Sequence, residues 1–103
     1  MASYIIRVEL HSGTPADYET LTAAMEAVGF TGGIRGESGA ASRLPTGQYV
    51  GTGEVTAAQA SQIAQGAALK TKRGYAVFVS DFTTAAWFGL DPIQAAEPAE
   101  VPA

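Results

Sequence analysis

Arginine, glutamate and histidine alternate near the start of the chain as Arg7, Glu9 and His11. Cleavage of a phosphodiester bond by a neighbouring 2′-hydroxyl needs a general base, a general acid and a cation that binds the phosphate. His11 is the only histidine, and a histidine with its usual pKa near 6.5 can exchange a proton at neutral pH. Glu9 could act as the base or as a metal ligand, and the planar guanidinium of Arg7 could bind the phosphate.

Three other residues, which come later in the chain, extend this candidate set. Asp81 is a third candidate catalytic group, because an antiparallel strand could bring it beside the first strand. Arg35 and Arg43 are candidate RNA-binding cations. An ordinary water-facing strand carries residues of the same types, and Arg7 could simply pair with an acid on a neighbouring strand. The sequence therefore leaves a structural role open beside the catalytic one.

No metal site is predicted, because the chain has one histidine, no cysteine and carboxylates without the spacing of a zinc site. A Mg²⁺ site built from Glu9 with Asp81 or Glu37 remains an alternative. The glycine-rich stretch between Gly32 and Gly53 does not have the spacing of a phosphate-binding loop. We expect it to form a hairpin connection.

The stretch from Tyr4 to His11 must position the candidate residues, and it alternates apolar and polar side chains. This period of two is typical of a half-buried strand, because successive side chains leave opposite faces of a sheet. If helices cover the apolar face, the Arg7–Glu9–His11 triplet lies on the open face, with about 7 Å between successive members.

The remaining pattern predicts two helices and three further strands. Thr14 with Pro15, and Thr56 with Gln59, are signals of helix N-termini, so we expect helices over about 15–28 and 57–70. Strands are expected over 30–35, 48–55 and 75–82. The last of these is apolar on both faces, which indicates a strand that is either central or covered.

This order of elements predicts an α+β fold of the ferredoxin-like βαββαβ type, with a four-stranded antiparallel sheet and both helices on one face. Right-handed crossovers would place the first and third strands at its centre. We expect one domain over residues 1–90 and a disordered acidic Pro/Ala tail over 91–103. Trp87 and Phe88 either close the core or dock a second copy, so a homodimer is an open alternative.

The charge distribution argues against bulk attraction to nucleic acid. The net charge is −4, but residues 91–103 carry three acids and no base, which leaves six Lys/Arg against seven acids, or −1, in residues 1–90. Polyanion binders are usually basic, so DNA binding is not expected and RNA would be held by a local patch. The chain shows no secretion signal and no apolar run near the ~18 residues of a membrane span. We therefore expect a cytoplasmic protein without a membrane partner.

Four short features resemble a known family: the first strand with an acid near its end (Tyr4 to Glu9), the helix exit from Met25 to Phe30, the Arg43-Leu44 pair after a glycine-containing hairpin, and the helix that opens at Thr56. Over roughly residues 4–82 the chain is similar to the GhoS family, the small antitoxin endoribonucleases of type V toxin–antitoxin systems.

The resemblance implies an RNase, related in fold to the small CRISPR adaptation nuclease, that cleaves the messenger RNA of a membrane-acting toxin with or without a metal ion. It assigns a role only to Glu9 and, more loosely, to Arg43. The glycine-rich hairpin and the acidic tail depart from the family pattern. A non-catalytic module of the same fold, which binds a protein or a second copy of itself, is the alternative.

Overall fold

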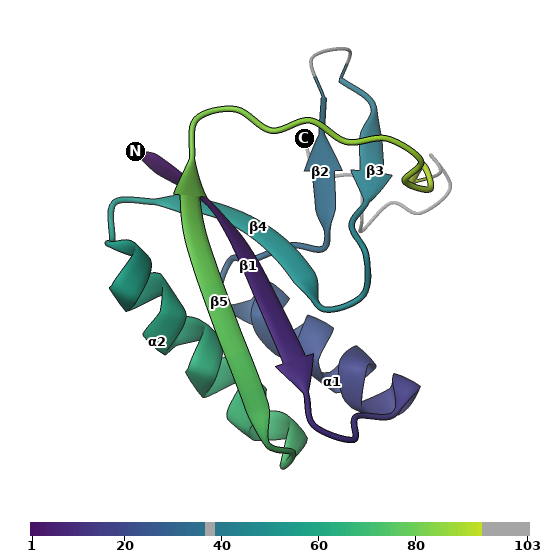
Figure 1. Ribbon diagram of the computed structural model, residues 1–103, viewed down its shortest axis with the longest axis vertical. Coiled ribbons are helices and arrows are strands. Elements are labelled where there is room, and N and C mark those ends of the chain that lie inside the picture. The colour runs from purple at the N-terminus through teal and green to yellow at the C-terminus, as the bar shows by residue number, and fades with distance from the viewer. Residues whose placement is uncertain (37–38, 94–103) are drawn as a thin grey trace.

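The computed structural model describes residues 1–36 and 39–93 and shows an α+β fold (Figure 1). Strands β1 (Ala2–Leu10), β4 (Gln48–Gly53) and β5 (Tyr75–Phe82) form an antiparallel sheet in the order β4-β1-β5. The short strands β2 (Gly33–Arg35) and β3 (Ala41–Arg43) form a second sheet. The helices are α1 (Pro15–Ala27), α2 (Ala57–Ala68) and the 3₁₀ turn η1 (Leu69–Thr71). The predicted α+β class is confirmed.

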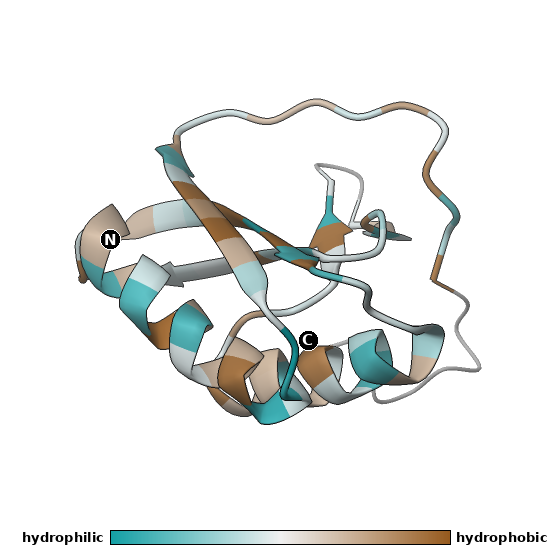
Figure 2. Cartoon of the chain, turned by 60° about the horizontal axis from the view of Figure 1, so that its bottom comes forward, coloured by the Kyte–Doolittle hydropathy of each residue, from teal (hydrophilic) through white to brown (hydrophobic). Residues whose placement is uncertain are grey.

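The core lies between the three-stranded sheet and the two helices, which cover the same face (Figure 2). Every second side chain of β1 points into this core, and Ile6 at its centre is 0% exposed. From the helices, Leu21, Met25 and the alanines of α2 pack against these side chains. Small alanine side chains allow α2 to lie close to the sheet. The alternation predicted for the first strand is therefore confirmed, and its polar positions are left on the open face.

Both helices begin with a capping box. The Thr14 hydroxyl accepts a hydrogen bond from the Asp17 N–H, and the Asp17 carboxylate accepts one from the Thr14 N–H at 2.9 Å. Thr56 and Gln59 exchange the same pair of bonds at the start of α2. Reciprocal bonds of this kind satisfy N–H groups that have no partner inside the helix. The two predicted helix starts are confirmed.

Asp17 also links α1 to the chain that enters β5, because the same carboxylate oxygen accepts a hydrogen bond from Nε of Arg73 at 2.7 Å. The Thr14 N–H and the Arg73 guanidinium both favour the charged carboxylate and lower the pKa of Asp17 from its ordinary value of 3.8. A lowered pKa means that the stabilisation is present above the ordinary pKa and is lost as the pH falls through the folded-state pKa.

We therefore expect acid to reduce the stability of the wild type more than that of Asp17→Asn. Urea unfolding at a series of pH values measures this, and the two free energies of unfolding should converge as the pH falls below about 4. If the two curves of stability against pH stay parallel through that range, the assigned role of Asp17 is wrong.

The predicted four-stranded sheet is not confirmed, because β2 lies outside the main sheet. The segment that leads into β2 pairs with β4 at one point only, where Thr31 and Val50 exchange two backbone hydrogen bonds of 2.8 Å. Beyond Thr31, the strand β2 pairs with β3, and β3 pairs in turn with the segment 91–93. The backbone groups of β2 thus find partners away from β4.

The C-terminal part of the described chain crosses from the end of β5 to the β2-β3 hairpin (Figure 1). Arg43 N–H donates to Asp91 O at 2.8 Å, and Ile93 N–H donates to Ala41 O at 3.1 Å. The first residues of the predicted tail are therefore paired with a strand, while 94–103 lie outside the described residues. Trp87 is 37% exposed, Phe88 is 99% exposed, and neither belongs to the buried core, so the alternative in which they close the core is not what the fold shows.

In the described ranges 1–36 and 39–93, no helix is long and apolar enough to cross a membrane.

Candidate functional site

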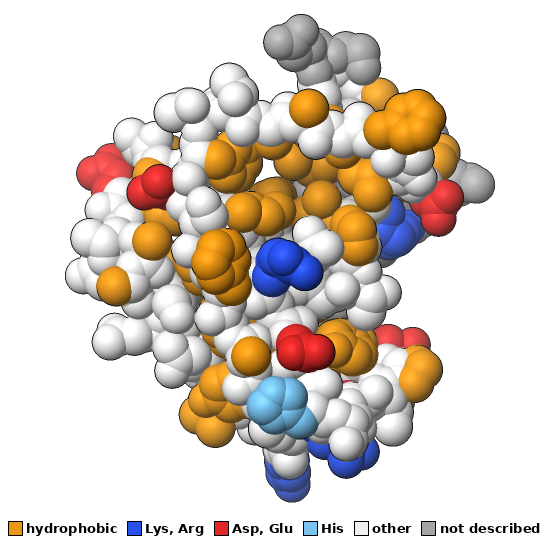
Figure 3. All heavy atoms as spheres, in the orientation of Figure 1, with side chains coloured by type: hydrophobic (Ala, Val, Ile, Leu, Met, Phe, Trp, Pro, Cys, Tyr) orange, Lys and Arg blue, Asp and Glu red, His pale blue; other side chains and the backbone are white. Residues whose placement is uncertain are grey.

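The Arg7–Glu9–His11 triplet lies on the open face of the sheet, as predicted. In the register of β1 with β5, Arg7 is opposite Phe78 and Glu9 is opposite Ala76. The His11 N–H continues this register with a hydrogen bond of 2.7 Å to Gly74 O. All three side chains are exposed. Figure 3 looks onto this face, where charged side chains of both signs and the histidine lie among hydrophobic groups.

The charges of the triplet are not neutralised by neighbours. The residues opposite Arg7 on the two flanking strands are Phe78 and Gln48, and neither is acidic. Within the described part of the chain, neither Arg7 nor Glu9 forms an ion pair. The alternative in which Arg7 pairs with an acid on an adjacent strand is therefore not what the fold shows. Both charged groups are available to a ligand.

A shallow hollow of about 390 Å³ lies beside the triplet and is lined by Arg7, Glu9, Gln48 and Phe78, among others. Phe78 is 63% exposed, although burial of a Phe ring stabilises a protein by about 1.5–3 kcal/mol. An exposed ring beside a guanidinium and an amide can stack on a nucleobase while the polar groups bind phosphate. Phe78 and Gln48 were not predicted from the sequence, because only the strand register places them beside Arg7.

Asp81 is not brought to the triplet. It is opposite Tyr4, whose side chain is buried on the helix side, so Asp81 leaves the sheet on the face away from Glu9. Asp81 is also five positions along β5 from Ala76, the partner of Glu9, which is about 17 Å in a strand. Direct cooperation between Asp81 and Glu9 is therefore excluded by this geometry.

Arg35 and Arg43 belong to the β2-β3 hairpin and do not line the hollow beside Arg7. The guanidinium of Arg35 donates to Gly39 O within the hairpin. Arg43 instead lines a second, larger concavity. The six predicted site residues thus separate into a triplet on the open face, one acid on the opposite face and two hairpin arginines.

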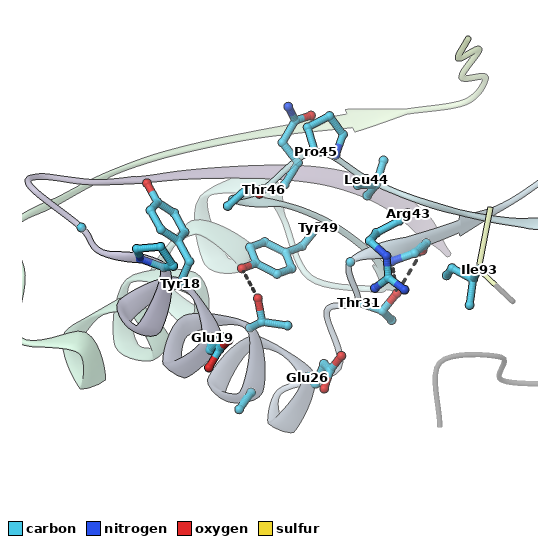
Figure 4. A pocket seen from close by; sticks show the side chains of 18 of the residues that line it. Tyr18, Glu19, Glu26, Thr31, Arg43, Leu44, Pro45, Thr46, Tyr49 and Ile93 are labelled. Atoms are coloured by element: carbon cyan, nitrogen blue, oxygen red, sulfur yellow. Dashed lines mark hydrogen bonds between the residues drawn. The ribbon is translucent and has the colours of Figure 1, made fainter. Parts of the chain in front are cut away.

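The larger concavity is a groove of about 940 Å³ between α1 and the chain that joins β3 to β4 (Figure 4). At its base the hydroxyls of Tyr49 and Thr22 share a hydrogen bond of 2.8 Å, and burial raises the pKa of Tyr49. Glu19 and Glu26 line the helix side, which disfavours a polyanion there. No pattern in the sequence predicted this groove.

Metal ligands are not assembled in the two described ranges, where no three His, Cys, Asp or Glu side chains lie together. Glu37, a member of the alternative Mg²⁺ site, lies outside the described residues. On the open face, Glu9 is the single carboxylate of the triplet.

No protein-family model matches this chain, and no curated protein matches it significantly.

Proposed function

We propose that the chain is a small endoribonuclease that binds and cleaves single-stranded RNA on the open face of its sheet. The observation that carries the proposal is the exposed Arg7–Glu9–His11 triplet, which forms no ion pair with the described residues, beside the exposed ring of Phe78. The resemblance to GhoS supports the finer role of an antitoxin that acts on toxin messenger RNA in the cytoplasm. The single Thr31–Val50 bridge on the outer side of β4 supports a ferredoxin-like fold, because the fourth strand of that fold pairs there.

The proposed reaction is transesterification by the 2′-hydroxyl of the RNA. Arg7 binds the scissile phosphate and offsets charge that develops on its oxygens. Of Glu9 and His11, one removes the 2′-hydroxyl proton and the other donates a proton to the departing 5′-oxygen. The products are a 2′,3′-cyclic phosphate and a 5′-hydroxyl end. A spacing of about 7 Å between neighbouring triplet residues leaves room for a phosphodiester. DNA lacks the attacking hydroxyl and is not a substrate.

The experiment is a cleavage assay with single-stranded and structured RNAs, with Mg²⁺ or with EDTA. We expect the wild type to cleave and the Arg7/Glu9/His11 triple-alanine variant to be inactive. A double variant of exposed acids on α1, Glu19→Ala/Glu26→Ala, is the matched control and should retain activity. Cleavage that does not exceed that of the triple variant would rule out the nuclease.

The alternative is a non-catalytic module that associates with itself. The observation in its favour is the outer edge of β5, which has no strand partner in the described chain. Intact RNA together with a stoichiometric self-complex would favour this alternative.

A further inference from the structure

The outer edge of β5 presents a row of backbone groups that pair with no other strand of the described chain. His11 N–H donates to Gly74 O, so these two residues form a hydrogen-bonded pair. Hydrogen-bonded pairs alternate along an antiparallel ladder, so in this register the even-numbered residues of β5 exchange hydrogen bonds with β1. The N–H and C=O groups of the odd-numbered residues therefore point away from β1. In the chain as described, β1 is the only strand that pairs with β5. These outward-facing groups belong to Tyr75, Val77, Val79 and Asp81, and of them Asp81 O also accepts a hydrogen bond of 3.2 Å from the Ser80 hydroxyl.

This edge has few of the features that protect the edges of monomeric sheets. Such edges are usually short, or carry lysine, proline or a bulge. β5 has eight residues, pairs with β1 without a bulge, and contains neither lysine nor proline. Its only charge is Asp81, and Phe78 is 63% exposed. A strand with apolar residues on both faces and an open edge is suited to pairing with another strand.

We propose that a second copy of this chain occupies the edge, so that two β5 strands pair antiparallel about a two-fold axis at Phe78. In this register Val77 pairs with Val79 of the second copy, and Tyr75 pairs with Asp81 of the second copy. The outward-facing backbone groups of all four residues are then paired, with about eight backbone hydrogen bonds. Phe78 lies opposite Phe78 of the second copy, in the closer type of pair, where aromatic side chains contact each other.

The charges of the strand favour the antiparallel arrangement. Arg73 precedes β5 and Asp81 lies near its end. Two antiparallel copies place each Asp81 diagonally across from Arg73 of the other copy, about 7–8 Å apart between backbones. The Nε of Arg73 is bonded to Asp17 of its own copy, so its terminal nitrogens are the atoms that would reach Asp81. A parallel arrangement would instead place like charges beside each other. The edge is thus complementary to itself in charge as well as in hydrogen bonding.

The dimer has one continuous six-stranded sheet in the order β4-β1-β5-β5-β1-β4. Both triplets lie on its open face, and their two β1 strands are separated by three strand spacings, or about 14 Å. The two Phe78 rings form a shared aromatic surface between them. The association itself requires no RNA and does not depend on the proposed function.

Cysteine cross-linking tests both the dimer and its register, because the chain has no cysteine of its own. In the proposed register the two Phe78 Cα atoms are about 4.5 Å apart, which suits a disulfide. We expect Phe78→Cys to oxidise to a covalent dimer almost completely. The matched control is Ala76→Cys, which is exposed on the same strand but about 14 Å from its counterpart, and it should remain monomeric. Equal cross-linking of both variants, or of neither, overturns the proposed register.

Sedimentation equilibrium of the unmodified chain, without RNA, is the second measurement. We expect a mass of twice 10.6 kDa at micromolar concentration. Phe78→Asp places two carboxylates together at the axis and should give a monomer, while Phe88→Asp, at a side chain that is 99% exposed, should remain a dimer. A wild type that is monomeric at about 100 μM overturns the proposal, whether or not RNA is cleaved.

Discussion

His11→Ala is expected to lower the first-order rate constant of RNA cleavage by about 10²–10⁴-fold, the usual contribution of a positioned acid or base. The side chain is exposed beyond the end of β1, so its removal should leave the free energy of unfolding almost unchanged. Added imidazole should restore part of the activity, because the space that His11 leaves is open to solvent. The measurement is a single-turnover time course with a labelled RNA.

Glu19→Ala serves as the control for this experiment, since Glu19 is an exposed residue of α1 that lies outside the hollow beside Arg7. Its rate constant should equal that of the wild type. A His11→Ala variant that cleaves within threefold of the wild type would show that His11 takes no part in proton transfer.

Ile6→Ala should reduce the free energy of unfolding by about 2–5 kcal/mol, because Ile6 is 0% exposed in the core and its truncation leaves a cavity. Its neighbour Ile5 is half-buried on the open face, so Ile5→Ala should cost less, about 1 kcal/mol. Urea unfolding of the two variants measures the difference. Equal losses would contradict the assignment of the two faces of β1 and, with it, the exposure of the triplet.

Local patterns were sufficient to predict the parts of the fold that depend on neighbours in sequence. The alternation in β1 depends on pleat geometry alone, and the starts of both helices depend on residues three positions apart, such as Thr56 and Gln59. The exposure of Arg7 and Glu9 followed from the same alternation. These predictions needed no knowledge of which strands pair.

The position of β2 could not be predicted, because it depends on contacts between distant segments. Phe30 packs so closely on β4 that a Cβ at Gly51 would lie 2.4 Å from its ring, and the chain then leaves β4 after Thr31. The partner that β3 gains, residues 91–93, comes from the other end of the sequence. The groove beside α1 is lined by both of these segments, so no local pattern indicated it.

Asp81 was predicted to lie near Glu9, and Phe78 was not predicted as a site residue. Both errors have one cause, which is the register of β5 against β1. Side chains alternate between faces with a period of two, so a shift of one position would exchange the faces of both residues. The sequence of β5 is apolar on both faces and does not specify this register by itself. The observed pairing places Phe78 beside Arg7 and Asp81 opposite Tyr4.

The most direct test of the account is to map the contact surface of an uncleavable RNA on the isotopically labelled protein by NMR. A single-stranded RNA with 2′-O-methyl sugars has no free 2′-hydroxyl to attack the phosphate and should stay intact during the measurement. We expect amide shifts to change at Arg7, Glu9 and Phe78 and to stay constant at Glu19 and Glu26 in the groove. Changes centred on the groove, or none at any RNA concentration up to about 1 mM, would contradict a nucleic-acid site on the open face.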